Sequence, residues 1–306
     1  MIKSLRDAFG EKLVSEGEKI QNILAISCDL RNTCKLGSFF KKFPNRSFEI
    51  GIAEANAIGI AAGLSFLGFR PFVASFGSFI TGKNIEIRAT ISYNLAPVVI
   101  VGTHGGLIGA DGATQAALQD IAVMRSIPDI EIFQPCSPID VEKVLEYVVR
   151  SNKPTYLRIG RNEIKEFFDH DHKFKIGLGN IIKNGSKNLI ISSGPMVRNC
   201  IDAIRHFDNN QGDYGLLNLT SLKPLNENFL INTILPYDKV VVVEDHLIEG
   251  GIGSIVSEVI TKHGINKTVY RHGLDNEFIE SDTPEKLAKK YKLDSFGIFE
   301  YLNGLP

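Results

Sequence analysis

Apolar residues in the first half of the chain follow two alternating patterns. Apolar positions at helical spacing predict helices at residues 2–16, 53–67 and 138–149. Short runs that are apolar on both parities predict buried strands at 23–26 and 97–101. Gly68 stands where a C-cap glycine would end the second helix, and Pro71 prevents its continuation. This alternation is typical of a parallel sheet covered by helices on both faces.

The alternation restarts after about residue 180. Strands are predicted at 188–192, 214–219 and 239–244, with a helix at 197–207 between the first two. Near the end, Thr283 can cap a helix that begins at Pro284. The sequence therefore predicts an α/β protein with two doubly wound domains. The first spans residues 1–165, the second spans 183–306, and a polar linker joins them at 166–182.

Composition narrows the class of protein. The chain has 306 residues, of which 43% are hydrophobic and 23% charged, and 34 Lys and Arg nearly balance 35 Asp and Glu. Nothing in this balance favours nucleic acid or an anionic membrane as a partner, and no apolar stretch approaches the length of a membrane span. Four scattered cysteines without metal-site spacing are typical of reduced thiols. The expected location is the cytoplasm.

One segment contains several residues that can bind metals. Residues 169–172 read Asp-His-Asp-His, which places two imidazoles and two carboxylates close together. The segment lies in the polar stretch between the predicted domains, so a solvated linker is the favoured interpretation and no metal ligand is predicted.

Polar residues after predicted strands are the candidate site residues, because ligands of open α/β sheets bind beyond the carboxyl ends of the strands. Glu54 opens the helix that follows the strand-like residues 48–50. An acidic residue in a first helical turn also interacts favourably with the helix dipole, so position alone leaves its role open. Phe76 and Phe79 lie three residues apart and could be ordinary core aromatics.

A long loop with five glycines, residues 102–115, follows the clearest strand of the first half. Its glycines let the backbone approach a ligand closely, while His104 and Asp111 supply an acid/base group and a carboxylate. Arg158 and Arg161 follow another predicted strand and suit an anion such as a sugar phosphate, with surface arginines as the alternative. A second glycine cluster at 250–253 lacks the full spacing of a nucleotide-binding turn.

As a set, these segments resemble the C-terminal half of the transketolase family, in the form that is split over two genes. The matching stretches are Ser27-Cys-Asp-Leu30, Gly51-Ile-Ala-Glu-Ala-Asn56, Ser75-Phe-Gly-Ser-Phe79, Thr103-His104, Gly109-Ala-Asp-Gly-Ala-Thr114, Met124-Arg-Ser-Ile-Pro128, Glu244-Asp-His246 and Gly250-Gly-Ile-Gly-Ser254. Their order and spacing cover nearly the whole chain. The resemblance implies a thiamine diphosphate enzyme with a pyrimidine-binding domain and a transketolase C-terminal-like domain.

The resemblance assigns roles to individual residues. It implies that Glu54 is catalytic and hydrogen-bonds the aminopyrimidine of thiamine diphosphate, favouring the tautomer that activates the cofactor. It implies that Phe76 and Phe79 pack around the pyrimidine ring. His104, also expected to be catalytic, and Asp111 would contact the hydroxyls of the donor sugar. Two further residues, Thr33 and Arg161, would hold the phosphate of the acceptor.

The resemblance also shows what this chain lacks. In the family's other half, a Gly-Asp-Gly motif followed by Asn binds the divalent metal that bridges the diphosphate, and this sequence has no such motif. The resemblance therefore implies that an N-terminal transketolase subunit provides the diphosphate site and Mg²⁺. Two copies of each chain form the simplest closed assembly, with the cofactor between subunits.

Two departures bear on the substrate. Where many transketolases have Thr-His-Gln, this chain has Thr114-Gln115-Ala116, so an amide that cannot transfer a proton stands near the expected substrate position. The loop is also shorter than usual and approaches that of 1-deoxyxylulose 5-phosphate synthase. Transfer of a two-carbon ketol unit between sugars is the first expectation. A decarboxylating synthase, a 2-oxo acid dehydrogenase β subunit and a non-catalytic regulatory paralogue are the alternatives.

Overall fold

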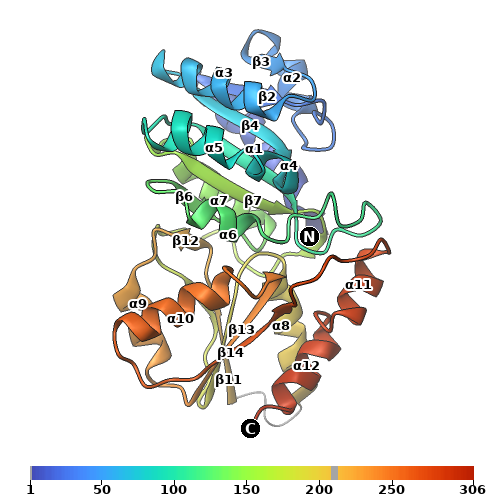
Figure 1. Ribbon diagram of the computed structural model, residues 1–306, viewed down its shortest axis with the longest axis vertical. Coiled ribbons are helices and arrows are strands. Elements are labelled where there is room, and N and C mark those ends of the chain that lie inside the picture. The colour runs from blue at the N-terminus through green and yellow to red at the C-terminus, as the bar shows by residue number, and fades with distance from the viewer. Residues whose placement is uncertain (1, 208–212) are drawn as a thin grey trace.

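The computed structural model describes residues 2–207 and 213–306, which form two α/β domains stacked end to end (Figure 1). The first domain contains a seven-stranded sheet with the order β12-β6-β7-β5-β4-β2-β3. Its strands are β2 (Ile23–Ser27), β3 (Ser47–Glu49), β4 (Arg70–Phe76), β5 (Val99–Gly105), β6 (Glu131–Phe133), β7 (Thr155–Gly160) and β12 (Ser221–Lys223). All neighbours are parallel except β12, which runs antiparallel to β6.

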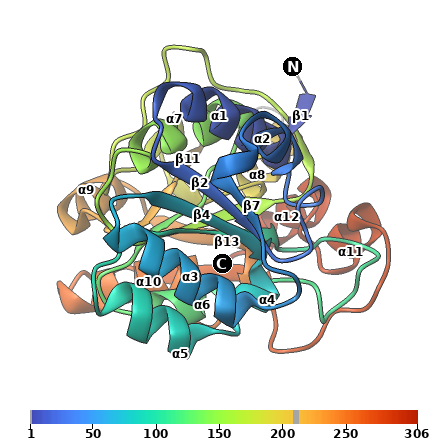
Figure 2. The same ribbon diagram turned by 90° about the horizontal axis from the view of Figure 1, so that it is seen from above.

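Helices cover both faces of this sheet, as Figure 2 shows. One face carries α1 (Leu5–Lys19), α2 (Gly37–Lys42) and α7 (Pro138–Val148), whose apolar side chains form one core with the sheet. The other face carries α3 (Glu54–Phe66), the π-helical turn η2 (Ile87–Ser92) and α6 (Asp120–Arg125). Three short helices, α4 (Gly77–Thr81), α5 (Asn84–Glu86) and η1 (Pro44–Arg46), complete the domain.

The second domain has a five-stranded sheet with the order β14-β13-β10-β11-β9. Its strands are β9 (Asn180–Lys183), β10 (Asn188–Ser192), β11 (Tyr214–Asn218), β13 (Lys239–Leu247) and β14 (Val269–Leu274), of which only the edge strand β9 is antiparallel among the described strands of this sheet. Its helices are α8 (Met196–Ile204), α9 (Glu227–Ile234), α10 (Ile252–Lys262), α11 (Pro284–Lys290) and α12 (Ser295–Asn303). Alternate β10 side chains face opposite layers: Ile190 packs in the core that contains α8 and α12, whereas Leu189 and Ile191 pack in the core that contains α9 and α10.

The two domains share structure across their junction. Strand β12 follows β11 of the second domain along the chain but joins the sheet of the first domain, where Ser221 pairs with Phe133. One hydrophobic core also continues from Ile132 of the first domain to Leu219 and Leu222 of the second. Because pairing and apolar contacts both cross the junction, the second domain supports the first domain's sheet at its edge.

The predicted α/β architecture is confirmed, with one boundary wrong at the N-terminus. Ile2 does not begin a helix but lies in a short strand, β1 (Ile2–Ser4), which pairs antiparallel with β8 (Glu163–Lys165). The helix starts later because Ser4 is its N-cap, with Oγ accepting a hydrogen bond from the backbone N–H of Asp7 (3.1 Å). No helix in the described part of the chain is long and apolar enough to cross a membrane.

Candidate active site

Glu54 is a buried carboxyl group at the start of α3. The preceding turn uses Gly51 at φ +80°, and the N-cap residue Ala53 offers no side-chain acceptor to the first helical turn. The Glu54 side chain is 7% exposed, and its Oε1 accepts a hydrogen bond from Ser75 Oγ at the end of β4 (2.9 Å). Burial, followed by the nearby Glu54 charge, raises the pKa of Cys28 to about 12, which keeps this thiol protonated. The second carboxyl oxygen of Glu54 has no protein donor among the described residues.

Three aromatic rings lie together at the carboxyl ends of β4 and β5. Phe76, the last residue of β4, stacks on Phe79 of α4 with ring centroids 5.2 Å apart. Phe76 also contacts the imidazole of His104, the centroids being 3.8 Å apart. The register of the sheet explains this meeting, because Phe76 pairs with Thr103 in the adjacent strand β5. The sequence-predicted residues Phe76, Phe79 and His104 therefore form one aromatic group.

His104 is buried in an uncommon backbone conformation. Its φ is +60°, a left-handed value that costs a non-glycine residue about 1–3 kcal/mol. Burial, followed by the charges of Arg6 and Arg161, lowers the pKa of His104 to about 3. The imidazole is therefore neutral at physiological pH.

The hydrogen bonds around His104 define its tautomer. Arg6 can only donate, so Nε2 of His104, 3.4 Å from the Arg6 guanidinium, is the acceptor. Nδ1 then carries the proton and donates to Thr103 Oγ1 (2.9 Å), which in turn donates to the carbonyl of Ser75 (3.2 Å). A chain of hydrogen bonds thus connects His104 with Ser75, the residue that binds Glu54.

Arg6 is a site residue that the sequence did not indicate. It lies in the first turn of α1, where it donates to the carbonyl of Thr33 (2.9 Å), and its Nε is buried without a partner among the described residues. Arg161 forms an ion pair with Asp111 and donates to the carbonyl of Ile108 (3.3 Å). Burial, followed by the charge of Arg161, lowers the pKa of Arg6. Arg6, bound to the Thr33 carbonyl, therefore lies close enough to Arg161 for the two charges to influence each other, an arrangement suited to an anion.

The glycine-rich loop, residues 106–119 between β5 and α6, carries two further predicted residues. Asp111 contacts Arg161 rather than forming part of the aromatic group. The backbone carbonyl of Gln115 accepts from Ser78 Oγ of α4 (2.8 Å), while the side-chain Oε1 is buried without a donor among the described residues. The amide oxygens of Gln134 and Asn218 are buried without a partner as well, so this feature alone does not single out Gln115.

The prediction of Arg158 as an anion ligand is wrong. Arg158 does not follow β7 but lies within it, 1% exposed, and its guanidinium binds the carboxylates of Asp120 and Asp245. Both faces of β7 are covered, so a residue within the strand is buried, whereas Arg161 lies just past the strand end and is partly exposed.

The segment 169–172 is only partly the solvated linker that was predicted. Residues 169–171 are exposed, but the imidazole of His172 stacks on Phe168, and its Nε2 lies 3.1 Å from Asp140 Oδ1. Within the described ranges, no group of three or more His, Cys, Asp or Glu residues is arranged to hold a metal ion.

The glycine cluster at 250–253 binds a carboxylate of its own chain. Glu244, near the end of β13, accepts from the backbone N–H of Ile252 (2.6 Å) and of Gly253 (3.0 Å). A Cβ atom on Gly251 would lie 2.0 Å from a Glu244 oxygen, so glycine is required for this contact. The helix N-terminus that could attract a phosphate is thus already neutralised by Glu244.

Comparison with known proteins agrees with this geometry. A family model for the transketolase pyrimidine-binding domain matches residues 3–166, and one for the transketolase C-terminal domain matches residues 177–298. The chain belongs to the transketolase family.

Curated relatives are of two kinds. A putative transketolase C-terminal section of Methanocaldococcus jannaschii is 34% identical over 97% of this chain and 94% of its own. A subunit of the apulose-4-phosphate transketolase of Actinobacillus succinogenes is 28% identical over 95% of this chain and 94% of its own. A 1-deoxy-D-xylulose-5-phosphate synthase of Caldanaerobacter subterraneus is 32% identical over 96% of this chain, which spans only 48% of that longer protein.

Solved structures give the same fold. A split-gene transketolase in an inactive beta4 tetramer superposes with a TM-score of 0.90 and 31% identity, covering 98% of this chain and 97% of that chain. The transketolase of Campylobacter jejuni superposes with a TM-score of 0.84 at 18% identity, and 100% of this chain corresponds to 47% of that chain.

Proposed function

We propose that the chain is the C-terminal subunit of a split transketolase, which transfers a two-carbon ketol unit from a ketose, commonly a phosphate, to an aldose. The observation that carries the proposal is the buried Glu54 carboxyl group, which accepts a hydrogen bond from Ser75 near the end of β4, the strand whose last residue, Phe76, stacks on Phe79. Relatives described as a transketolase C-terminal section and as one subunit of a transketolase, each matched over 94% of its own length, support the split form.

The residues of this edge fit the pyrimidine end of thiamine diphosphate. Glu54 keeps one oxygen without a protein donor among the described residues, which suits a proton shared with a ring nitrogen, and Phe76 and Phe79 offer an apolar surface for an aromatic ring. When bound, thiamine diphosphate supplies the carbon nucleophile that accepts the ketol unit. Ser75 has the role of fixing the Glu54 carboxyl group in place.

The remaining residues bind and orient sugars. The Nδ1–H of His104 donates a hydrogen bond to Thr103. Because its pKa is about 3, His104 is neutral at neutral pH and cannot act as an acid, so it serves as a hydrogen-bonding group for sugar hydroxyls. Asp111 and Gln115 contact the donor sugar. Arg161 and Thr33 hold the acceptor phosphate.

Arg6 joins the phosphate site in this proposal. Its Nε has no partner among the described residues, and its charge lies close enough to Arg161 to lower its pKa. Bringing two cations together costs energy, which a dianionic phosphate would recover.

A partner completes the site. We propose that an N-terminal subunit carries the diphosphate and Mg²⁺ ligands and that two copies of each chain assemble, in the cytoplasm. The inactivity of the solved beta4 tetramer supports the need for a second kind of chain in that relative. We also propose that the chain has two domains, residues 1–165 and 183–306, joined by the polar stretch 166–182.

One alternative has a specific observation in its favour. The relative described as 1-deoxy-D-xylulose-5-phosphate synthase is 32% identical to this chain, and Gln115 replaces a histidine of many transketolases. A decarboxylating carboligation is therefore the second candidate. A 2-oxo acid dehydrogenase β subunit and a non-catalytic paralogue lack such an observation.

Reconstitution tests the proposal. The chain is co-purified with a candidate N-terminal subunit that carries the Gly-Asp-Gly motif, and the complex is assayed with thiamine diphosphate and Mg²⁺. We expect ketol transfer from a ketose phosphate to an aldose, and no turnover by either subunit alone. Carbon dioxide release from pyruvate without ketol transfer would favour the synthase, and full activity of this chain alone would refute the partner requirement.

A further inference from the structure

The guanidinium of Arg158 binds the C-terminal end of the glycine-rich loop and packs against Gly105, the residue just before the loop. Its Nε donates to the Asp120 carboxylate (2.9 Å) where the loop runs into α6, and its Nη2 donates to the carbonyl of Ala117 (2.9 Å) near the end of the loop. A Cβ atom on Gly105, where the loop begins, would lie 2.8 Å from Arg158 Nε. Glycine at this position lets β5 pass directly over the arginine.

The same contacts reach the strained backbone of His104. The N–H of Ala117 donates to the carbonyl of His104 (3.1 Å), and the N–H of Gly106 donates to the carbonyl of Ala117 (3.1 Å). Ala117 thus clasps the residues on both sides of Gly105. Because Arg158 holds the Ala117 carbonyl as well, it stabilises the clasp that keeps His104 at φ +60°.

The second domain completes this arrangement. Asp245 of β13 accepts from Arg158 Nη1 through Oδ1 (2.8 Å) and from Nη2 through its carbonyl (3.2 Å). Burial alone would lower the pKa of Arg158, but the charges of Asp120 and Asp245 raise it above its ordinary value. A Cβ atom on Gly106 would lie 2.0 Å from Asp245 Oδ2, so the loop and the second domain are in direct contact.

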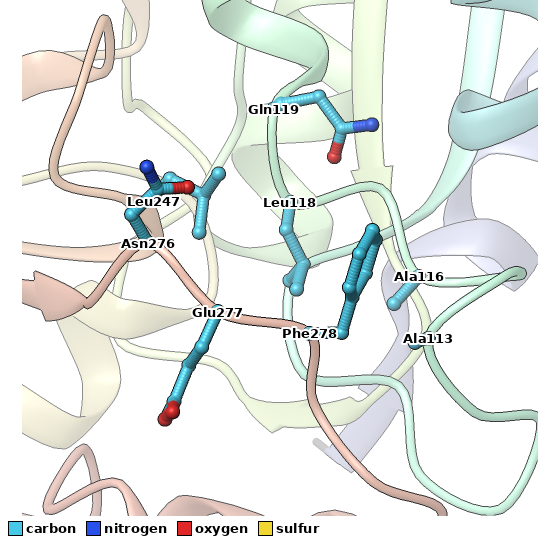
Figure 3. A pocket seen from close by; sticks show the side chains of 8 residues that line it. All are labelled: Ala113, Ala116, Leu118, Gln119, Leu247, Asn276, Glu277 and Phe278. Carbon is cyan, nitrogen blue, oxygen red and sulfur yellow. The ribbon is translucent and has the colours of Figure 1, made fainter.

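Other contacts of the second domain fall on the same loop. The N–H of Leu247 donates to the carbonyl of Leu118 (2.9 Å), and Ser281 Oγ donates to the carbonyl of Ala110. A pocket of about 270 Å³ is lined by loop residues and by Phe278 of the second domain. In Figure 3 the Phe278 ring lies beside Leu118 and Ala116 of the loop. The loop is therefore fixed near its ends by polar contacts and leaves open space toward Phe278.

We propose that Arg158 is a positioning residue, which together with Asp245 holds the glycine-rich loop and His104 in the conformation that binds the substrate. The effect that we expect on the reaction rate rests on the proposed function. It gives the second domain a defined role in the reaction, although its residues Asp245 and Leu247 act only through the loop.

Two pairs of variants test the proposal in the reconstituted complex. Arg158→Lys keeps the charge but cannot form the fork of hydrogen bonds to Asp120, Ala117 and Asp245. Asp245→Ala removes the acceptor from the second domain, whereas Asp245→Asn retains an oxygen for Arg158 Nη1. Arg70→Lys is the matched control. Arg70 is also a buried arginine, but it lies at the start of β4 and donates to the Val148 carbonyl (2.8 Å), away from the loop.

The kinetic readout separates positioning from general loss of structure. For Arg158→Lys and Asp245→Ala we expect kcat/KM for the ketose donor to fall about 10- to 100-fold. Thiamine diphosphate affinity should change less than kcat/KM for the donor, because Glu54 is held by Ser75 of β4 and not by the loop. Asp245→Asn should restore most of the activity. Equal losses in Arg70→Lys, or no rescue by Asp245→Asn, would overturn the proposal.

Hydrogen exchange of the full chain tests the same inference without any activity. In Arg158→Lys and Asp245→Ala, amides of the peptide 105–119 should exchange at least about tenfold faster, while the peptide over 54–66 is unchanged. If the complex has no ketol transferase activity but the loop exchanges faster, the proposed function fails and the positioning role stands. If the loop keeps its wild-type exchange rate in folded variants, the positioning role is wrong.

Discussion

The two sheets of this protein have similar polar side chains at the carboxyl ends of their strands, but these side chains have different partners. At the carboxyl edge of the first sheet lie Glu54 and His104, and the carboxyl end of β13 in the second sheet contains Glu244, Asp245 and His246. In the second domain every one of these polar groups has an internal partner. Glu244 binds two backbone N–H groups, Asp245 binds Arg158, and His246 Nδ1 lies 2.6 Å from the carbonyl of Leu247.

The first domain leaves part of its polar groups available. Glu54 has Ser75 as its donor within the described chain, and buried atoms of Arg6 and Gln115 have no partner there. Unsatisfied buried polar atoms cost about 1–3 kcal/mol each. The second sheet also has one, Asn218 Oδ1 at the end of β11, so the two edges differ in their carboxyl groups rather than in all of their polar atoms. Glu54 and Glu244 therefore differ in how many of their carboxyl oxygens the chain itself binds, one for Glu54 and both for Glu244.

Exchanging the two glutamates for glutamine gives the largest expected difference between the edges. Glu54→Gln should lower kcat about 10²- to 10⁴-fold, because the amide keeps the hydrogen bond to Ser75 but cannot share a proton with the cofactor. Glu244→Gln, the matched control, should leave kcat within about twofold. Steady-state rates of the reconstituted complex, normalised to the assembled fraction, measure both.

Two outcomes would contradict this prediction for the glutamate variants. Near-normal turnover of Glu54→Gln with bound cofactor would show that this carboxyl group is not the catalytic acid/base. A comparable loss in Glu244→Gln would show that the edge of the second sheet contributes more than internal structure. Analytical ultracentrifugation of each variant with the partner checks that assembly is intact.

The two cations of the first edge give the next largest effect. Arg161→Gln and Arg6→Gln should each raise KM for a phosphorylated acceptor about 10- to 100-fold, since a charged hydrogen bond contributes about 1.5–3 kcal/mol. An acceptor without phosphate should be much less affected. Arg150→Gln serves as the control, because Arg150 is 57% exposed and pairs with Glu16 away from the site.

The outcome for Arg6 is informative by itself. If Arg6→Gln leaves KM unchanged while Arg161→Gln raises it, the phosphate is bound by one arginine, and Arg6 serves only to hold Thr33 and His104. If neither substitution distinguishes phosphorylated from unphosphorylated acceptors, the anion site lies elsewhere.

Local patterns predict the α/β class and several strands of both sheets, but they give no prediction for β4, the central strand that carries Ser75 and Phe76. The β-branched and apolar runs identify β2, β5, β10 and β13, and Thr283 caps α11 with Pro284 in its first turn, as their residue types indicate. Strand β12 was missed, because its three residues pair with a strand far away in the sequence and carry no periodic signal of their own. Pairing between domains depends on tertiary packing rather than on local pattern.

The same limit applies to the site. Glu54 and His104 were identified because they stand at strand ends within recognisable stretches. Arg6 lies in an amphipathic helix, where an arginine is ordinary, and only the approach of α1 to Thr33 and His104 distinguishes it. Arg158 and Arg161 have the same side chain three residues apart, and sequence could not tell which one the strand buries.

The smallest expected effect concerns the stability of the first edge against acid. Because burial and the charges of Arg6 and Arg161 lower the pKa of His104 from 6.5 to about 3, the unfolded chain binds a proton more readily than the folded one across this range. Stability from neutral His104 is fully present above pH 6.5 and is lost as pH falls toward 3, at no more than about 1.4 kcal/mol per pH unit.

His104→Asn isolates this contribution, since asparagine tolerates the left-handed backbone and its oxygen or amide can contact Thr103, but it does not titrate. Between pH 6.5 and pH 5 the free energy of unfolding of the wild type should fall by about 1–2 kcal/mol more than that of the variant. Urea denaturation at several pH values measures the difference. Parallel pH profiles for the two proteins would mean that His104 titrates normally when folded, and that the cations beside it are screened by solvent.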